Sequence, residues 1–192
     1  MSNTLQNLIR KIIRQLGDDP NREGLRETPE RVTRMVAEVF KGYSMDPRNI
    51  FKAFNSDKYT GLIILKDIEF YSYCEHHLVP FFGKIHIGYK PNEKIIGISK
   101  LGRLVETFSR RLQLQERLTN QIRECLDKYL KPKGSAVIIE AKHLCVAMRG
   151  VQKQNALTIT SSYSGVLKKS NLKQEFLNYI RHEQNHGTQT YN

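Results

Sequence analysis

Cys74-Glu75-His76-His77 places a thiol and two imidazoles side by side, directly before an apolar run that begins at Leu78. Thiolate sulfur and imidazole nitrogen are ligands that a borderline-soft ion such as zinc prefers. A Cys-x-x-His spacing lets both side chains reach one ion across a tight turn. This spacing slightly favours His77 as the second ligand and leaves His76 for proton transfer, but it does not decide between the two histidines.

A second cluster, His143-Leu144-Cys145, is the best candidate source of a third ligand. Its two polar side chains alternate with a leucine at the two-residue period of a strand. Three protein ligands leave one position open, which is typical of a catalytic zinc site rather than a closed structural one. The plainer interpretation is that these cysteines are small buried apolar residues, as Cys125 is expected to be. The presence of two clusters favours the metal site.

The composition bounds the class of protein. A chain of 192 residues suits one domain with its own core, and a net charge of +12 suits a polyanionic partner such as nucleic acid, an anionic membrane or a phosphorylated small molecule. The basic residues are spread along the chain, and there is no tryptophan and no basic stripe interleaved with aromatic residues. A nucleic-acid-binding role is therefore disfavoured.

Targeting and cysteine usage predict a cytoplasmic protein. No run of 18 apolar residues could span a membrane, and residues 1–4 lead into a polar-faced helix without the apolar core of a signal peptide. Three cysteines, two of them in the candidate site, argue against a disulfide framework and for a reducing compartment.

The spacing of apolar residues predicts an α+β fold with a mostly antiparallel sheet. We expect helices over residues 5–16, 29–40, 99–108, 118–130 and 171–180, the last capped by Ser170, and strands over 62–73, 84–89, 95–98, 135–142 and 155–163. Residues 84–89 and 95–98 are expected to form a hairpin with His86 on its surface. The sheet packs one face on the helices, and its open edges suggest oligomerisation.

We predict a single domain over residues 1–192. It would comprise a mainly helical segment over 1–58, a core over 59–183 and a disordered tail over 184–192. Ser99, Lys100 and Arg103 open one predicted helix, where free N–H groups and basic side chains together could bind an anion. Arg31 lies in the first turn of another helix, off its apolar stripe. The alternative for all four is a solvated surface role.

Four motifs, in this order, resemble the GTP cyclohydrolase I family: Cys74-Glu75-His76-His77, Gly97-Ile98-Ser99-Lys100-Leu101-Gly102-Arg103, Gln113-Leu114-Gln115-Glu116-Arg117-Leu118-Thr119 and His143-Leu144-Cys145-Val146-Ala147-Met148-Arg149-Gly150. Thr28-Pro29-Glu30-Arg31 is similar to an early helix of that family, and the resemblance runs from about Leu5 to Leu177. It implies a tunnelling (T) fold, a sheet with helices on one face that assembles into an oligomeric β-barrel ring.

The resemblance also implies a reaction and an assembly. The family's zinc-dependent members hydrolyse GTP at C8, release formate and rebuild the ring as 7,8-dihydroneopterin triphosphate. They form decamers of two stacked pentamers with active sites at subunit interfaces. Whether the product serves folate, tetrahydrobiopterin or deazapurine synthesis is left open by the resemblance.

By the same resemblance, each functional residue receives a role. Zinc is held by Cys74, His77 and Cys145, and the catalytic histidines are His76 and His143. The guanine edge is held by Gln115 and Glu116. The triphosphate and ribose are bound by Ser99, Lys100, Arg103 and Arg149, with Arg31 offered by a neighbouring subunit.

The residue types suit this chemistry. A histidine with a reference pKa near 6.5 can protonate N7 of the purine and later shuttle protons. The ionised Glu116 carboxylate only accepts hydrogen bonds, so it can take both N–H groups on the N1/N2 edge of guanine, a pair that adenine lacks.

Two alternatives remain at this point. A related T-fold enzyme would be a nitrile reductase, with a cysteine nucleophile and no zinc, or a pterin synthase with a histidine-only metal site. The paired cysteine and histidine ligands disfavour both. A basic zinc-stabilised nucleic-acid-binding module requires a fourth metal ligand, which the sequence does not offer at suitable spacing, and predicts steep salt dependence of binding.

Overall fold

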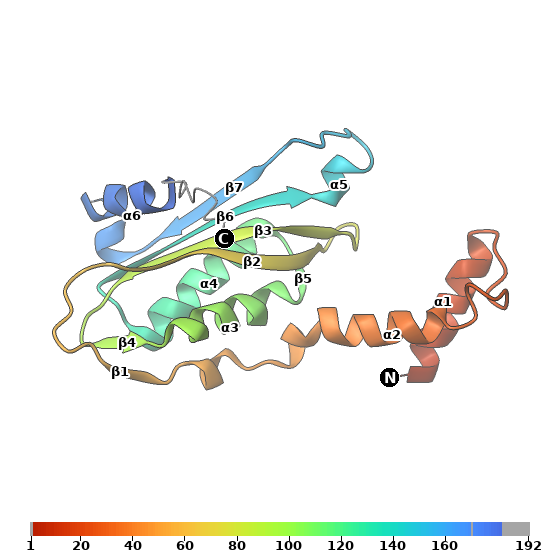
Figure 1. The fold of residues 1–192 in the computed structure, drawn as a ribbon, viewed down its shortest axis with the longest axis horizontal. Coiled ribbons are helices and arrows are strands. Elements are labelled where there is room, and N and C mark those ends of the chain that lie inside the picture. The colour runs from red at the N-terminus through yellow and green to blue at the C-terminus, as the bar shows by residue number, and fades with distance from the viewer. Residues whose placement is uncertain (1, 170, 182–192) are drawn as a thin grey trace, which may run out of the picture.

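The computed structural model describes residues 2–169 and 171–181. Its main element is a five-stranded sheet in the order β5-β2-β3-β6-β7 (Figure 1). Strands β2 (Ile63–Cys74), β3 (Pro80–Lys90), β6 (Gly134–His143) and β7 (Thr158–Tyr163) pair antiparallel, and the two-residue β5 (Leu112–Gln113) pairs in parallel with the end of β2. The predicted α+β class and mostly antiparallel sheet are confirmed.

Helices α3 (Ile98–Ser109) and α4 (Gln115–Leu130) cover one face of this sheet. In α3, Leu101, Leu104, Val105 and Phe108 recur at helical spacing and are buried, each contributing about 1.5–3 kcal/mol through burial. The alternate residues of β3 that point to the same face are also fully buried, and they complete the core: Ile85, Ile87 and Tyr89.

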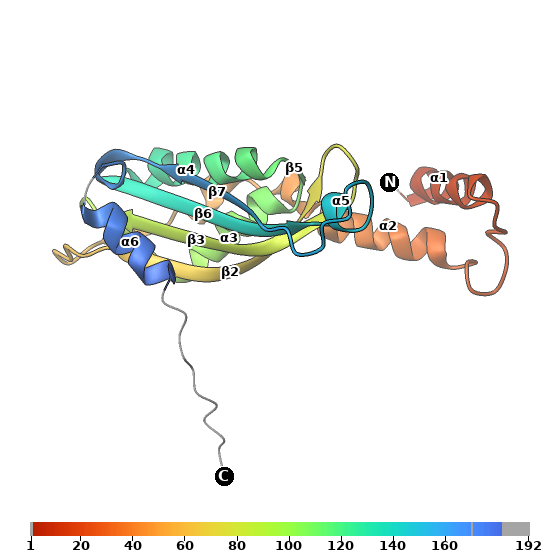
Figure 2. The same ribbon diagram turned by 90° about the horizontal axis from the view of Figure 1, so that it is seen from above.

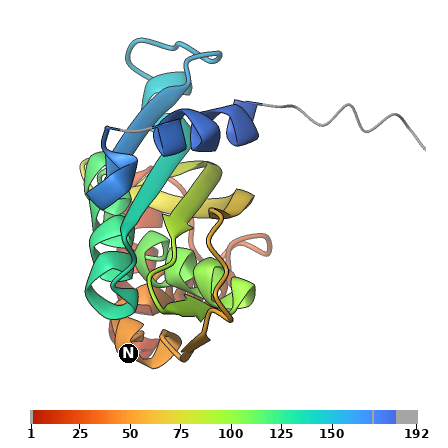
Figure 3. The ribbon, with the colours of Figure 1, turned by 90° about the vertical axis from the view of Figure 1, so that its left-hand side faces the viewer.

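Helix α6 (Asn171–Arg181) lies on the opposite face of the sheet, as Figures 2 and 3 show. Phe176 of α6 is fully buried and sits directly over Gly88 of β3, where an added Cβ would lie 2.6 Å from its ring. Only glycine admits the ring this closely. The expectation of helices on one face was therefore wrong, because the small side of β3 accepts α6 from the other face.

The N-terminal helices α1 (Ser2–Gln15) and α2 (Thr28–Val39) pack on each other and project beyond the end of the sheet (Figures 1 and 2). Several of their apolar side chains are exposed, with Leu8 at 49% and Ile12 at 53%. The short helices η1 (Lys41–Ser44) and η2 (Pro47–Ile50) lead back to the sheet, where Arg111 Nε donates to the carbonyl of Gly42 at 3.0 Å.

Two local expectations were wrong. Strand β4 (Lys94–Ile96) pairs with β1 (Ala53–Asn55), in a separate two-stranded sheet, rather than with β3. His86 is 4% exposed rather than on the surface, because its Nδ1 accepts a hydrogen bond from the backbone N–H of Asp67 at 3.2 Å. That N–H is turned towards His86 at an irregularity in the β2–β3 register, where Asp67 adopts a φ of 58°.

Among the described residues, no helix has the length and apolar character that crossing a membrane requires. The predicted cap at Ser170 and the predicted tail over 184–192 lie outside the described residues.

Candidate metal and nucleotide site

The Cys74-Glu75-His76-His77 motif forms a tight turn between β2 and β3. The backbone N–H groups of His77 and Leu78 both donate to the carbonyl of Cys74, at 3.3 and 2.9 Å. Leu78 adopts a φ of 55°, which reverses the chain into β3. This turn brings His77 Nδ1 to 3.6 Å from Cys74 Sγ, as the spacing predicted.

The second cluster reaches the same place through strand pairing. Antiparallel pairing of β3 with β6 sets His143 opposite Phe81, next to the turn. The chain then enters a single helical turn, α5 (Leu144–Ala147), rather than continuing as a strand. Cys145 of α5 joins Cys74 and His77, and the three ligand atoms lie within 4.8 Å of one another.

The three ligands differ in exposure. Cys74 is buried, Cys145 is half-buried and His77 is exposed, so the cluster lies at the surface with a protected floor. Burial raises the pKa of the Cys145 thiol, and the neighbouring Cys74 raises this pKa further. Two thiolates this close repel each other, and a bound dication would relieve that repulsion. Two sulfurs and one imidazole nitrogen suit zinc among the common divalent ions.

His143 is held beside this cluster by two contacts. Its ring stacks on Phe81, with centroids 4.6 Å apart and planes within 4°. Its Nε2 lies 2.7 Å from Oε1 of Gln115, the first residue of α4. Burial lowers the pKa of His143, and the nearby Glu116 charge opposes that effect; the net lowering favours the neutral imidazole.

Glu116 is exposed in the first turn of α4, where the helix dipole favours a carboxylate. The adjacent Arg117 forms an ion pair with Glu75, which lies in the turn between β2 and β3. Arg117 Nη2 and Glu75 Oε1 are 2.9 Å apart. This ion pair holds the start of α4 against the turn that carries two of the candidate metal ligands.

Comparisons with known proteins show which family the chain resembles. The family model described as GTP cyclohydrolase I matches residues 5–181. A protein of Porphyromonas gingivalis (strain ATCC 33277) named GTP cyclohydrolase 1 is 52% identical over 178 residues, which cover 92% of each chain. Proteins of the same name from Bacteroides fragilis and Wolinella succinogenes are each 48% identical, covering 92% and 93% of this chain and 92% and 96% of theirs.

The chain belongs to the GTP cyclohydrolase I family. Several residues that the family resemblance singles out meet at one end of the sheet, around the Cys74–His77 turn: Cys74, His76, His77, Gln115, Glu116, His143 and Cys145. Arg149 is exposed just beyond α5, and its charge reaches Cys145.

The other residues that the GTP cyclohydrolase I resemblance assigns to the triphosphate and ribose lie on other elements. Ser99 and Lys100 are in the first turn of α3, whose last residue, Ser109, leads into β5 beside Cys74. The rise of an α-helix places them about 15 Å along its axis from Ser109. Arg31 lies on the projecting α2, 66% exposed and paired with Glu27. Within the described residues, no hydrogen bond or ion pair joins these side chains to Cys74, His77 or Cys145.

The sequence did not reveal the side chains that hold the candidate site residues in place. Phe81 is the first apolar residue of β3, but nothing in its local sequence indicates that it stacks on His143. Glu75 and Arg117 both lie inside the recognised motifs. Their opposite charges could have indicated that they form an ion pair. The internal hydrogen bonds of Gln115 depend on strand register, which the sequence does not specify.

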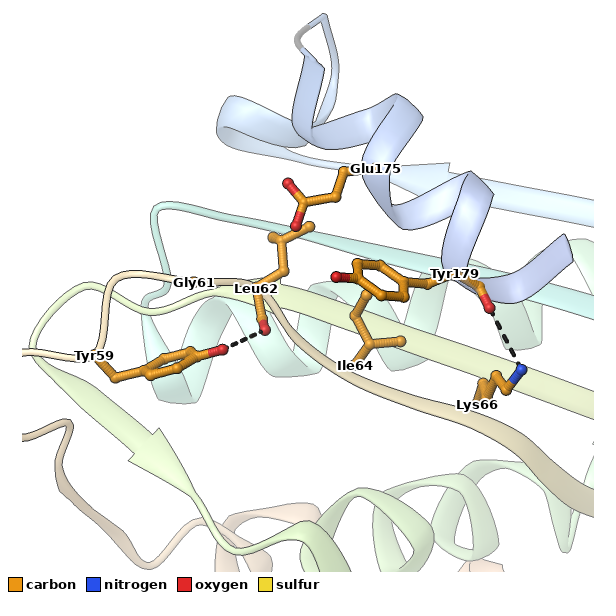
Figure 4. A pocket seen from close by; sticks show the side chains of 7 residues that line it. All are labelled: Tyr59, Gly61, Leu62, Ile64, Lys66, Glu175 and Tyr179. Carbon is orange, nitrogen blue, oxygen red and sulfur yellow. Dashed lines mark hydrogen bonds between the residues drawn. The ribbon is translucent and has the colours of Figure 1, made fainter. Parts of the chain in front are cut away.

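A cavity of about 500 Å³ lies away from this site, between α6 and the first half of β2 (Figure 4). Tyr179 and Glu175 of α6 line one side, and Leu62 and Ile64 line the other. It contains none of the residues that the GTP cyclohydrolase I resemblance assigns to zinc or GTP.

Proposed function

We propose that this chain hydrolyses GTP at C8, releases formate and rebuilds the ring to give 7,8-dihydroneopterin triphosphate. The observation that carries the proposal is the meeting of Cys74, His77 and Cys145 within 4.8 Å, with His143 beside them, in a member of this family. Relatives named GTP cyclohydrolase 1 at about half identity over most of the chain support the same activity.

Zinc is the proposed cofactor, held by Cys74, His77 and Cys145. When bound, zinc supplies a hydroxide nucleophile at neutral pH, because it lowers the pKa of water from 15.7 to about 7. Reduced cysteines are required for this role, which suits a reducing compartment such as the cytoplasm.

His143 and His76 are the proposed proton-transfer residues. The neutral imidazole of His143 can accept a proton and return it to a purine nitrogen, which is typically worth about 10²–10⁴ in rate. His76 is exposed on the turn, with its ring centroid 6.0 Å from that of His77, and it can exchange protons with solvent. Together they connect the buried side of the site to water.

Glu116 is the proposed guanine-recognition residue. Its carboxylate is exposed at the N-terminus of α4, close enough to His143 for its charge to influence that imidazole. An ionised carboxylate accepts two N–H groups from the N1/N2 edge of guanine and leaves adenine without matching donors. GTP should therefore be preferred to ATP.

The proposed triphosphate and ribose site needs more than one copy of the chain. Arg149 lies near the metal ligands, whereas Ser99, Lys100 and Arg103 belong to α3 and Arg31 belongs to the projecting α2. Neighbouring subunits would bring these residues to the metal ligands and their positive charge to the phosphates.

Two sheet edges support such an assembly. Within the described residues, β2 pairs with β5 only at Tyr73 and Cys74, so its outer edge from Ile63 to Ser72 has no strand partner, and β7 is the other edge. Open edges of this length favour pairing between copies. We propose that β7 of one copy pairs with β2 of the next to close a T-fold β-barrel ring, in a decamer of two stacked pentamers.

The test is incubation of the zinc-loaded protein with GTP and, in parallel, with ATP, with formate and oxidised-pterin fluorescence measured in both. Formate and pterin from GTP alone are expected. Formate without pterin would limit the activity to ring opening, and no product from protein with verified zinc would overturn the proposal in favour of another T-fold reaction. Sedimentation analysis of the same sample tests the decamer.

A further inference from the structure

Gln115 is buried to 1% exposure at the point where α4 begins beneath β6 and β7. Its side-chain nitrogen lies 3.1 Å from the carbonyl oxygen of Ile139, 3.0 Å from that of Thr158 and 3.1 Å from Thr160 Oγ1. Its side-chain oxygen lies 2.7 Å from Nε2 of His143. The amide of Gln115 is therefore fully used by contacts within the protein.

The surrounding groups fix which way this amide points. Carbonyl oxygens only accept hydrogen bonds, so the NH₂ group must face the strands and Oε1 must face His143. The hydroxyls agree with this orientation. Thr119 Oγ1 donates to the Gln115 carbonyl at 2.7 Å, which leaves it to accept from Thr160 Oγ1, also at 2.7 Å. Thr160 Oγ1 can then accept from the Gln115 amide.

This orientation selects one form of the His143 ring. Because Oε1 of Gln115 has no hydrogen to donate, Nε2 of His143 must carry the proton of their hydrogen bond. In the neutral ring, Nδ1 then has the free lone pair, and within the described residues no hydrogen bond of Nδ1 is found. Stacking on Phe81 fixes the plane of the same ring.

We propose that Gln115 is a positioning residue that holds His143 with its proton on Nε2, so that Nδ1 is the nitrogen that exchanges protons with the substrate. The inference rests on the proposed function of His143 in proton transfer. It reassigns Gln115, which the family resemblance placed on the guanine edge, and leaves that edge to the exposed Glu116. A histidine in the wrong tautomer presents a hydrogen where the reaction needs a lone pair.

The direct test reads the tautomer without substrate. Solid-state ¹⁵N spectra of zinc-loaded, histidine-labelled protein distinguish protonated from unprotonated ring nitrogens, and the His143 signals are those lost in His143→Asn. We expect Nε2–H in the wild type. In Gln115→Met, which keeps the length of the side chain but removes its acceptor, we expect a mixture of both tautomers.

Gln113→Met is the matched control. Gln113 is also buried, at 2% exposure, and its amide donates to the carbonyl of Phe108 at 3.0 Å and to Gln121 at 2.8 Å. The change removes a comparable set of buried hydrogen bonds without touching the histidine. The control should lower thermal stability as Gln115→Met does, yet leave the His143 tautomer intact.

Gln115→Glu keeps the proposal testable if Gln115→Met does not fold. Its carboxyl group is of the same size, and when the oxygen that faces the strand carbonyls carries a proton, the other oxygen still accepts from Nε2–H, so the wild-type tautomer should persist. A neutral His143 ring in Gln115→Glu with its proton on Nδ1 instead of Nε2, or a wild-type tautomer in folded Gln115→Met, would overturn the proposal.

Kinetics with GTP separate positioning from substrate binding. We expect Gln115→Met to lower kcat about 10- to 100-fold, a part of what acid–base catalysis supplies, with KM within about threefold of the wild type. A raised KM with an unchanged kcat would return Gln115 to the guanine edge and overturn the proposal. If the wild type itself failed to turn over GTP, the proposed function would fail, whereas the tautomer would still report on the positioning contact.

Discussion

Arg117 and Glu75 form a two-point ion pair that joins α4 to the turn carrying Cys74 and His77. A backbone hydrogen bond reinforces the connection, because the N–H of Glu75 donates to the carbonyl of Gln113 at 3.1 Å. The candidate metal ligands and the proposed guanine-recognition helix are therefore joined directly.

Removing this pair should weaken metal binding without removing a ligand. We expect Glu75→Gln to lower zinc affinity about two- to fivefold, the range typical of a partly exposed ion pair. Competition with a chromophoric chelator measures the change. The charge-swapped double variant Glu75→Arg, Arg117→Glu should recover most of it, and Arg22→Gln, which breaks a surface pair with Asp18, serves as control. Equal affinity in all four proteins would show that the turn needs no anchor.

Metal binding and turnover should separate at two residues of the second cluster. Cys145→Ser should lose zinc and GTP hydrolysis together, because a hydroxyl is a far poorer zinc ligand than a thiolate. His143→Ala should keep its zinc and lose about 10²–10⁴ in kcat. Zinc content by elemental analysis and formate release, measured on the same samples, check both outcomes.

Cys125→Ser is the control for this pair. Cys125 is buried in the core between α4 and its neighbours, and burial raises the pKa of its thiol to about 11. The Cys125→Ser variant should keep its full zinc content and should lose only stability. Full activity in His143→Ala would contradict the acid–base role proposed for that residue.

Glu116→Ala should weaken GTP binding while leaving zinc content unchanged. Hydrogen bonds to a charged group are worth about 1.5–3 kcal/mol, so we expect KM for GTP to rise about 10- to 100-fold. Glu124→Ala, at an exposed glutamate further along the same helix, is the control. Wild-type KM in Glu116→Ala would exclude the carboxylate from guanine recognition.

The buried His86 should make stability depend on pH. Burial lowers its pKa below the ordinary 6.5, an effect that the charge of Asp67 opposes. On acidification the unfolded chain therefore takes up a proton before the folded protein does, so the free energy of unfolding falls below about pH 6.5. The slope is at most about 1.4 kcal/mol per pH unit.

Urea unfolding of the wild type and of His86→Gln, compared between pH 7.5 and pH 5.5, measures this contribution. The difference between the two proteins should shrink as the pH falls, because only the wild type carries the linked proton at this site. Asp67 does not interfere, since Lys84 lowers the pKa of its carboxyl below the ordinary 3.8, outside this range. If the free energy of unfolding changed equally with pH in the two proteins, His86 would have the same pKa in the folded and unfolded states.

The sequence predicted the elements whose pattern is local. The apolar spacing of residues 101–108 and 118–130 predicted α3 and α4, and the Cys-x-x-His spacing predicted the turn that brings Cys74 to His77. The candidate ligands Cys74, His77 and Cys145 were also correctly expected to meet. The helices and the turn depend on neighbours within a few residues, whereas the meeting with Cys145 was expected from two separate motifs and is made by the pairing of β3 with β6.

The errors concern contacts set by tertiary structure. His86 alternates with buried residues, so period-two patterning placed it on the surface, but the displaced backbone of Asp67 gave it a buried partner. Strand β4 is closer in sequence to β3, yet its partner is β1. The positioning role that we propose for Gln115 likewise depends on two strand carbonyls, so no local pattern could have suggested it.

The register that places Phe81 opposite His143 also has a consequence for the order of folding. Cys74 and Cys145 are about 70 residues apart, so an ion that joins them closes a long loop, and the entropy of that closure opposes early binding. Once the β3–β6 ladder has formed, the two cysteines are already close together and this entropy has already been lost. Metal capture should therefore be a late step, in which zinc slows unfolding much more than it accelerates folding.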